Sequence, residues 1–453
     1  MSGSIPGSAG ILDTVDALWV TYHDYAGIGR AKAVPRVRFA EVLERGVTFA
    51  LANWDLAVND HQVPQPVFGA DSGDFRVVPD PTTIVPIPYR SRVAQALGWL
   101  VDESGAPWVG DPRGRLAEQV EALAGLGYTA RVSFEAEFLL ANAGETGWRP
   151  ADRGRMFTVD AIEARWSYCA AVLDALAGMG IAVHQLAKEY GPGQYEISLL
   201  PSDPVQAADS FLLARQVIKA LARDAGMTAT FMPKPFAELP GNGLHVHLSL
   251  QDSTGREVLA DLANDDRLSD VGTAAVSGLL AHARGQAALG APTPNSYKRL
   301  LPGSWAPAHI CWAFGNRAAL VRIPGRGSGR RFEYRSGDAA ANPYLHLAGL
   351  LAAIIDGIDR RLPPVPAATG DVGHWSDEEA LSHGIARLPT SLNEALGAFA
   401  EDEVLGAAVG SLIREHYLAV KSFELDSYRA EIGSAHDTTD VTEWERTVYL
   451  ELL

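Results

Sequence analysis

Charged or imidazole side chains alternate with apolar residues in several short segments of this chain, and no other feature restricts its fold as strongly. The clearest case is residues 241–250, GNGLHVHLSL. Side chains along a β-strand point alternately to opposite faces, so His245 and His247 share one face while Val246 lies on the other. Two imidazoles on one face can bind a metal ion or a nucleotide phosphate. Two hydrogen-bonded histidines on a half-buried strand are the plainer alternative.

Residues 131–140, RVSFEAEFLL, carry a second pair, Glu135 and Glu137, flanked by two phenylalanines. Adjacent carboxylates on an apolar strand repel each other, and burying them is costly unless a cation neutralises them. Taken alone, the pair indicates either a cation site or a solvated strand face.

Two further segments repeat this pattern. Arg331, Glu333 and Arg335 alternate in RRFEYR, an arrangement that neutralises itself and alone would indicate a surface ladder. Glu189 and Glu196 stand on either side of a Gly-Pro-Gly turn that joins two strand ends, which alone would be a loop with two acids.

Together these segments predict one sheet whose concave face holds divalent cations and a polyanion. Carboxylates with an occasional imidazole favour Mg²⁺ or Mn²⁺ over Zn²⁺. Arg299, Arg317 and Arg322 lie in Gly- and Pro-rich surroundings, and arginine binds carboxylate and phosphate bidentately. Metals and arginines in one site suggest phosphoryl transfer from a nucleotide. The sequence has no Walker A motif and no GxGxxG between a strand and a helix, so this ATP site is neither a P-loop nor a Rossmann site.

The composition is that of a soluble globular protein, with 47% hydrophobic and 21% charged residues among 453. This length predicts two or three domains, or one large domain with a small appendage. The net charge of −17 argues against nucleic-acid and anionic-membrane partners. With two cysteines, no signal peptide and no run of about 18 apolar residues, we expect a cytoplasmic protein.

The coarse organisation is α+β. Residues 1–10 have the composition of a flexible lead-in. Strands expected at 17–22, 30–35, 75–79 and 83–86 surround a short helix at 39–44, which predicts a small α+β domain. Longer helices are expected after it, with an exposed loop at 366–382. The helix ranges are 112–126 with Asp111 as N-cap, 161–178, 204–225, 342–359, and from 392 onward.

Several blocks along the chain, in order, resemble the motifs of class I-like glutamine synthetases. They are residues 230–235 (TFMPKP), 241–249 (GNGLHVHLS), 295–300 (NSYKRL), 316–317 (NR), 322–324 (RIP), 331–335 (RFEYR) and 341–344 (ANPY). Residues 75–86 resemble the end of the family's small N-terminal domain. The resemblance implies an α+β fold with a flexible N-terminus (1–10), a β-grasp domain (11–108) and a catalytic domain (109–453). In that domain a curved antiparallel sheet, a half-barrel, is backed by helices.

The resemblance also implies roles for the residues that match. Six resemble ligands of two or more Mg²⁺ or Mn²⁺ ions: Glu137, Glu189 and Glu196 for one ion, and Glu135, His245 and Glu333 for another. Those resembling contacts to ATP, the co-substrate, are His247, Ser249, Arg317, Arg322 and Arg331. Those resembling contacts to glutamate are Arg299, Arg335, Gly243 and Asn242. Arg299, Arg317 and the flap residue Trp305 are expected beside the reacting groups.

The implied chemistry has two steps. The γ-carboxylate of glutamate attacks the γ-phosphate of ATP to give γ-glutamyl phosphate and ADP, and an amine nitrogen then displaces phosphate. Metals and arginines stabilise the charge that grows during transfer. The family forms two stacked rings with active sites between subunits, so the resemblance implies a dodecamer that binds glutamate, ATP and a small amine.

The departures from the family fall on the amine side. Its Pro-Gly-Tyr-Glu-Ala-Pro flap reads PGSWAP here, so Trp305 replaces the acid that takes a proton from ammonium. The family's Asp-Gly-Ser-Ser-Ile segment, which brings an ammonium-binding acid from the neighbouring subunit, is replaced near residues 52–56, ANWDL. Asp74 resembles the second acid of that region. Trp305 and Trp54 are both suited to packing against an alkyl or aryl group.

Three functions are compatible with these residues. We favour a γ-glutamyl–amine ligase acting on an organic amine, because the ATP, metal and glutamate sides match the family while the amine side does not. The first alternative is a glutamine synthetase that uses ammonium. The second is a catalytically silent regulator of nitrogen status, against which the retention of all six metal ligands argues.

Overall fold

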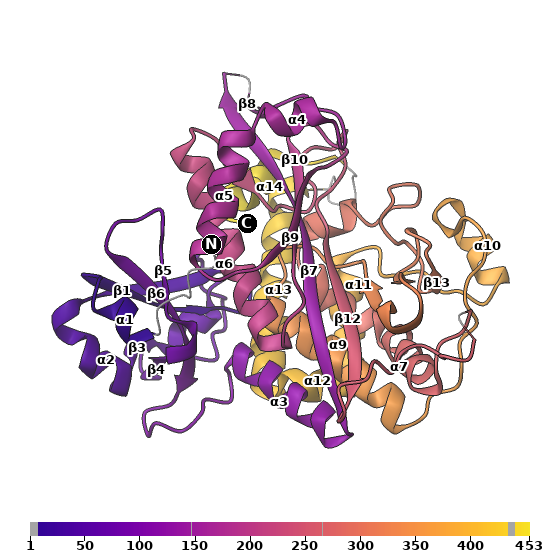
Figure 1. Cartoon of the computed structure of the whole chain (residues 1–453), viewed down its shortest axis with the longest axis horizontal. Coiled ribbons are helices and arrows are strands. Elements are labelled where there is room, and N and C mark those ends of the chain that lie inside the picture. The colour runs from indigo at the N-terminus through magenta and orange to yellow at the C-terminus, as the bar shows by residue number, and fades with distance from the viewer. Residues whose placement is uncertain (1–7, 146, 265, 434–439) are drawn as a thin grey trace.

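Two β-sheets organise this protein, whose computed structural model describes residues 8–145, 147–264, 266–433 and 440–453. A small N-terminal domain lies beside a larger unit in which helices back a nearly closed, barrel-like sheet (Figure 1). The mixed α and β architecture predicted from the sequence is confirmed. Residues 8–10 of the expected lead-in belong to helix α1 (Ser8–Leu12), and residues 1–7 lie outside the described residues. Within the described ranges, no helix is long and apolar enough to cross a membrane.

The N-terminal sheet has six strands in the order β2-β1-β6-β4-β3, with β5 paired to β6. β1 and β6 run parallel, and the other pairs are antiparallel. The strands expected at 17–22 and 30–35 are present and pair as an antiparallel hairpin, and the expected short helix is α2 (Phe39–Arg45). The strand expected at 83–86 keeps only two residues, because a turn capped by Asp80 occupies Pro81–Thr83. The strands are β1 (Ala17–His23), β2 (Gly29–Pro35), β3 (Val47–Ala50), β4 (Asp74–Pro79), β5 (Val85–Pro86) and β6 (Val93–Val101).

The large sheet has nine strands in the order β13-β14-β15-β12-β7-β10-β9, with β8 and β11 paired to β7. All its pairs are antiparallel, as expected, except β13 with β14, which is parallel. Its strands are β7 (Tyr128–Gly144), β8 (Gly147–Pro150), β9 (Val183–Lys188), β10 (Gln194–Leu199), β11 (Thr228–Thr230), β12 (Leu244–Asp252), β13 (Trp312–Phe314), β14 (Val321–Ile323) and β15 (Phe332–Tyr334).

Helices cover the apolar face of the large sheet. Phe134 and Val246, which alternate with the polar residues on β7 and β12, are buried in one core with Phe211 of α6 and Leu347 of α9. Asp111 caps α3 as predicted, since its side chain accepts a hydrogen bond from the N–H of Arg113. The longer helices are α3 (Pro112–Gly125), α5 (Trp166–Gly178), α6 (Pro204–Asp224), α7 (Asp270–Ala281), α8 (Ala283–Gly290), α9 (Pro343–Asp359), α11 (Leu392–Glu401) and α13 (Ser411–Ile432).

Two local predictions are corrected. The helix expected over 161–178 is two helices, α4 (Val159–Glu163) and α5, because the backbone at Arg165 leaves helical geometry, with φ of −121° and ψ of 16°. The loop expected at 366–382 contains α10 (Asp377–Ser382), which Ser376 caps. The remaining short helices are α12 (Glu403–Val409) and α14 (Glu443–Glu445).

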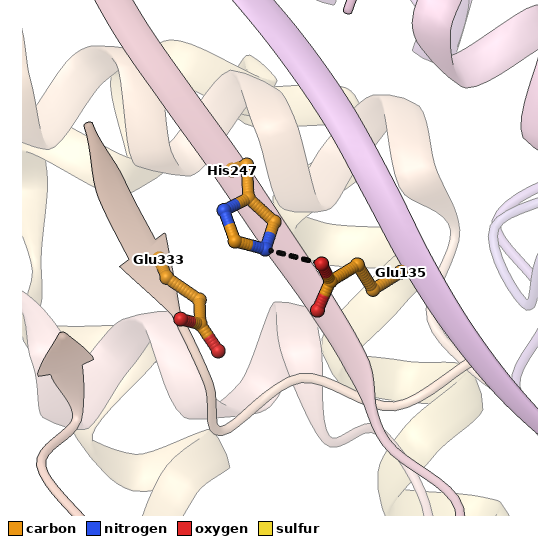
Figure 2. A group of neighbouring side chains, drawn as sticks. All are labelled: Glu135, His247 and Glu333. Atoms are coloured by element: carbon orange, nitrogen blue, oxygen red, sulfur yellow. Dashed lines mark ion pairs between the residues drawn. The ribbon is translucent and has the colours of Figure 1, made fainter. Parts of the chain in front are cut away.

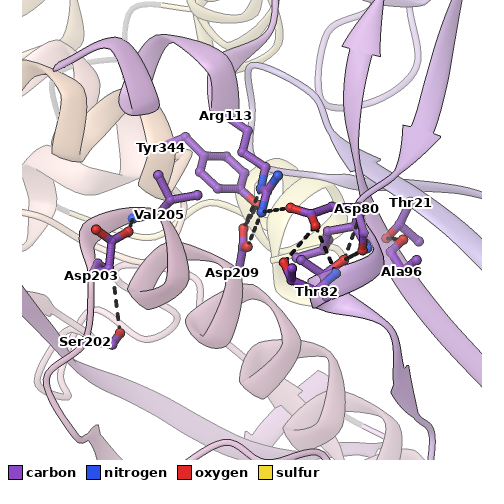
Figure 3. Close-up of polar contacts among 12 residues, drawn as sticks. Thr21, Asp80, Thr82, Ala96, Arg113, Ser202, Asp203, Val205, Asp209 and Tyr344 are labelled. Atoms are coloured by element: carbon purple, nitrogen blue, oxygen red, sulfur yellow. Dashed lines mark hydrogen bonds and ion pairs between the residues drawn. The ribbon is translucent and has the colours of Figure 1, made fainter. Parts of the chain in front are cut away.

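A buried ion network joins the two domains. Arg113 of α3 lies between Asp80 of the N-terminal domain, at 3.0 Å, and Asp209 of α6, at 2.8 Å (Figure 3). The hydroxyl of Tyr344 donates a 2.6 Å hydrogen bond to Asp209. Burial raises the pKa of Asp209 despite the guanidinium, so losing Arg113 would leave this acid buried without its cation.

We expect Arg113→Leu to lower the free energy of unfolding by about 3–5 kcal/mol, because it strands two acids at the domain interface. Arg38→Leu is the matched control: its ion pair with Glu41 is exposed, and surface pairs contribute about 0–1 kcal/mol. Denaturant unfolding of both variants measures the difference. Equal losses in the two variants would contradict the role of the buried network.

Candidate active site

Strand register brings the predicted chemical side chains into adjacent rows. On β12, His245 is paired with Glu135 of β7, while His247 is paired with Ser133 of β7 on one side and Glu333 of β15 on the other. Every one of these residues sits at an alternate position of its strand. The period-two pattern in the sequence therefore becomes a continuous polar surface that crosses three strands.

Glu135, His247 and Glu333 converge from β7, β12 and β15 (Figure 2). Nε2 of His247 lies 3.0 Å from Oε1 of Glu135, within ion-pair distance. The geometry is not that of a hydrogen bond, and Nε2 has no hydrogen-bond partner among the residues described. On the other side of the ring, Nε of Arg331 donates a 2.9 Å hydrogen bond to Nδ1.

Two overlapping groups of side chains could each hold a metal ion. They are Glu135 with Glu196 and His245, and Glu135 with His247 and Glu333; within each group the donor atoms lie within 4.8 Å of one another. Nδ1 of His245 lies 3.7 Å from Glu135 and 3.9 Å from Glu333, so the predicted set of Glu135, His245 and Glu333 is also close together.

The donor set fits a divalent cation. Nδ1 of His245 is buried and has no hydrogen-bond partner in the described part of the chain, which is costly unless something binds it. Carboxylate oxygens surround it, and these are the ligands that Mg²⁺ and Mn²⁺ prefer.

Crowding of carboxylates shifts their pKa values. Burial, and then the charges of Glu135, Glu137 and Glu189, raise the pKa of Glu196 to about 8. Burial and the charge of Glu137 also raise the pKa of Glu189. Glu135, Glu137, Glu189 and Glu196 are therefore close enough for their negative charges to repel one another. A cation would relieve that repulsion.

Glu333 is held as a carboxylate by cations instead. Burial opposes its ionisation, but His245, Arg335, His247 and Arg322 together lower its pKa to about 2. Nη1 of Arg322 lies 2.6 Å from one oxygen, and Arg335 pairs with the other. Both arginines that the sequence assigned to substrates therefore also balance a buried acid.

The other predicted arginines differ in their surroundings. Arg299 is buried and donates hydrogen bonds to the carbonyls of Ser336, at 3.0 Å, and Arg335, at 2.9 Å. Arg317 is exposed. Its charge partly offsets the rise that burial causes in the pKa of Glu189, so Arg317 lies on the side of the site that is rich in acids.

The loop before β12 approaches the site closely. The N–H of Gly243 donates a 2.6 Å hydrogen bond to Glu137, and a Cβ at this position would lie 2.6 Å from Nη2 of Arg299, so a larger residue would displace that guanidinium. The amide of Asn242 is used within the protein, because it donates to Met232 and accepts from Gln194. Asn242 thus shapes the loop that carries Gly243.

Sequence reasoning missed the residues that hold the turn between Glu189 and Glu196. Nζ of the buried Lys188 donates hydrogen bonds to the carbonyls of Glu189 and Gly191. Asp152 accepts hydrogen bonds from the N–H of Gly193 and the hydroxyl of Tyr195. A lysine directly beside a predicted metal ligand was the only available signal, since Asp152 is distant in sequence.

Ser249 follows His247 on the same face of β12 and is half-buried. Its hydroxyl donates a 3.4 Å hydrogen bond to Glu257, which also accepts a 2.8 Å hydrogen bond from Gln251. Glu257 is a second carboxylate partner that the sequence patterns did not reveal.

The flap presents Trp305 with an indole that is 72% exposed and a backbone in the left-handed region, with φ of +63°. Its carbonyl accepts a 3.4 Å hydrogen bond from Nη2 of Arg335, and Gly303 donates a 2.8 Å hydrogen bond to the carbonyl of Gly373. The flap backbone is thus tied to the polar surface while the indole is exposed. A strained, exposed aromatic residue of this kind is typical of a functional position.

The N-terminal segment that replaces an acid-bearing loop is buried. Trp54, expected as an acceptor contact, is only 1% exposed and packs against Tyr25 and Trp108, so that prediction is wrong. Asp55 is fully buried, with Oδ1 2.9 Å from Nδ1 of His416. Asp74, at the start of β4, is exposed.

Comparisons with known proteins show the family to which the chain is similar. The domain described as "Glutamine synthetase, catalytic domain" matches residues 109–449, and "Glutamine synthetase N-terminal domain" matches residues 8–108. Similar proteins include the glutamine synthetases of Pyrococcus abyssi (33% identical over 431 residues, 94% of each chain) and Halobacterium salinarum (32% over 445 residues, covering 96% of this chain and 94% of the relative). Similar structures include a GmaS/ADP complex, with 30% identity, a TM-score of 0.84 and coverage of 98% and 99%. A novel glutamine synthase homologue has 30% identity, a TM-score of 0.83 and coverage of 96% and 99%.

Raising the pKa of Glu196 to about 8 in the absence of metal has a direct consequence for metal affinity. A cation binds the ionised carboxylate, so protons compete with it below pH 8 and not above. We expect the apparent affinity for Mg²⁺ to fall by about tenfold per pH unit as the pH is lowered from 8 to 6. Calorimetric titration in two buffers of different ionisation enthalpy measures the affinity and the released proton. Constant affinity between pH 6 and 8 would contradict the crowding of these acids.

Proposed function

The chain belongs to the glutamine synthetase family, and on this premise we propose that it joins glutamate to an organic amine. The family is one of ATP-dependent carbon–nitrogen ligases, which places ATP, glutamate and a nitrogen nucleophile in the reaction. The product would be a γ-glutamyl amide formed through γ-glutamyl phosphate. The acceptor is the part of this proposal that depends on the residues particular to this chain.

Trp305 is the observation that carries the proposal. The family's flap has an acid at this position, and a carboxylate can accept a proton from ammonium. An indole has an N–H donor and no basic atom, so Trp305 cannot take that proton. Its exposed ring can instead pack against an alkyl or aryl group of an amine.

The N-terminal domain supports the same choice. Asp55 is the acid in the segment that stands where the family has its ammonium-binding loop. It is fully buried beside His416 of the same chain and accepts a 2.7 Å hydrogen bond from the N–H of Phe68. Asp55 is therefore used within its own subunit, which leaves the acceptor side without that carboxylate.

The ATP and glutamate sides would work as in the family. Bound divalent ions would neutralise the phosphate chain and the acids that hold the ions. We assign the phosphate chain to His247 and Ser249 and to three arginines, and the glutamate α-carboxylate to the cluster at Gly243. The arginines for phosphate are Arg317, Arg322 and Arg331, and those for glutamate are Arg299 and Arg335. Charge on the transferring phosphoryl group grows beside these cations, which lowers the barrier.

Two alternatives have some support. The curated relatives at 32–34% identity are named glutamine synthetases, which favours ammonium as the acceptor. The structural neighbours named GmaS, a gamma-glutamylmethylamide synthetase, favour an amine. A catalytically silent regulator is disfavoured because the acids and imidazoles of the site are all present. The dodecamer, with active sites between subunits, and the cytoplasmic location remain predictions.

A panel of amines tests the proposal. With glutamate and Mg²⁺ present, we expect ADP release to depend on an alkylamine, ethanolamine, a polyamine or an aniline. At least one should exceed ammonium by about tenfold or more in kcat/KM, the equivalent of roughly 1.4 kcal/mol. Mass detection of the γ-glutamyl product identifies the acceptor. Ammonium as the best acceptor would establish the glutamine synthetase alternative, and no ADP with any amine would favour the regulator.

Exchange of the flap residue tests the role of the indole. We expect Trp305→Glu to increase kcat/KM for ammonium by about tenfold or more, since general-base groups contribute about 10²–10⁴-fold where fully effective. Activity on the preferred amine should fall in the same variant. Trp305→Ala is the matched control, because it shares the backbone strain at φ +63° and lacks the carboxylate. An equal response to ammonium in both variants would show that the flap does not select the acceptor.

A further inference from the structure

One short segment contacts both the acceptor flap and the loop that follows β13. Residues 370–373, which we call the strap, lie between these two parts of the chain. On the flap side, the N–H of Gly303 donates a 2.8 Å hydrogen bond to the carbonyl of Gly373. On the other side, Nδ2 of Asn316 donates a 2.9 Å hydrogen bond to the carbonyl of Gly370. Asn316 is thus joined to the flap through the strap.

Asn316 uses both polar atoms of its amide to hold this arrangement. Its Oδ1 accepts a 3.0 Å hydrogen bond from the N–H of Ala318, which closes a turn around Arg317. Its Nδ2 is then the atom that donates to the strap. The N–H of Ala318 needs an acceptor and the carbonyl of Gly370 needs a donor, and a side-chain amide supplies both in one group. A shorter serine hydroxyl would keep only the turn.

The strap itself is held against the body of the large domain. Val372 is 1% exposed and packs in one cluster with Ala313 of β13. Next to it, Oδ1 of Asp371 accepts a 3.3 Å hydrogen bond from the N–H of Gly373, and Oδ2 lies 2.8 Å from Nδ1 of His374. Asp371 therefore fixes the turn that presents the Gly373 carbonyl to the flap.

The flap depends on this support because its backbone is strained. Trp305 has a φ of +63°, and a residue other than glycine keeps such a conformation only where its surroundings hold it. The bond from Arg335 to the Trp305 carbonyl is 3.4 Å long, near the limit for a hydrogen bond. The bond from Gly303 to the strap is shorter, at 2.8 Å. Loss of the strap contact would therefore release the backbone that directs the indole.

We propose that the strap positions the acceptor flap, and that Asn316 and Asp371 are its positioning residues. This inference rests on the proposed joining of glutamate to an organic amine, in which the indole of Trp305 packs against the amine. Neither positioning residue belongs to the sets assigned to metal, ATP or glutamate. Both act on the amine through the backbone of the flap.

Hydrogen exchange of the flap in the protein without substrates tests the contact directly. Asn316→Ser keeps an acceptor for the N–H of Ala318 but is too short to reach the strap, and Asp371→Ala releases the turn of the strap. We expect exchange of the amides of residues 302–307 to increase about threefold to tenfold in each variant, as for loss of one hydrogen bond. Unchanged exchange in either variant would overturn the proposal.

Ser382→Ala is the matched control. The hydroxyl of Ser382 also donates an exposed hydrogen bond to a backbone carbonyl, that of Glu379 within α10, further along the chain from the strap. Flap exchange in this variant should equal that of the wild-type protein. An equal increase in the control would show general loosening and would overturn the specific role of the strap. Thermal unfolding of each variant separates release of the flap from loss of structure.

Steady-state kinetics with the preferred amine test the consequence for the reaction. We expect Asn316→Ser and Asp371→Ala each to raise the KM for the amine about threefold to tenfold, and to leave ADP affinity in the presence of Mg²⁺ within about twofold of wild type. In a Trp305→Ala background the same changes should alter this KM by less than about twofold, because they act through the indole. Equal effects in the two backgrounds would overturn the proposal, as would no effect in either.

Failure of the proposed function has a different signature. A wild-type protein that prefers ammonium, or that releases no ADP with any amine, would contradict the amine ligase. Hydrogen exchange would still report whether the strap positions the flap, so the two failures are distinguishable.

Discussion

Four glutamates crowd one region of the large sheet, and the arrangement of the surrounding residues follows from the cost of burying them together. Glu135, Glu137 and Glu189 each raise the pKa of Glu196 beyond the effect of its burial. The neighbouring Glu333 avoids this because two arginines pair with it from β14 and the end of β15. One half of the polar surface is thus neutralised by the protein's own arginines, whereas a bound divalent cation would neutralise the other half.

Much of the supporting polar structure acts on backbone rather than on side chains. Lys188 holds the turn after Glu189 through two carbonyls, and Arg299 lies on the carbonyls of residues 335 and 336. Because these contacts are made to backbone carbonyls, they hold a loop in position and leave the polar side chains of the site without an additional partner. The buried Arg113 network plays a similar part at larger scale, because it sets the N-terminal domain against α6 and α9.

The two ends of the site are built differently. The proposed nucleotide end consists of strand residues whose register and burial leave little freedom. The acceptor end consists of a flap whose backbone is pinned by Arg335 and Gly373, while its side chain at position 305 is exposed and in contact with solvent. Exchange of this one exposed side chain would therefore leave undisturbed the strands that we propose hold ATP and metal.

The sequence by itself determined which residues share a face, because a strand alternates every two residues. It thereby predicted the row of Glu135, His245, His247 and Glu333, and the helix cap at Asp111 follows from local hydrogen bonding in the same way. Contacts between distant segments were decided only by the tertiary structure. Trp54 lies in an aromatic core rather than at the acceptor, Asn242 serves its own loop, and Arg331 donates a hydrogen bond to a histidine 84 residues away. Alternation specifies the face on which a side chain lies, but only packing across strands and loops decides which partner occupies each of its polar atoms.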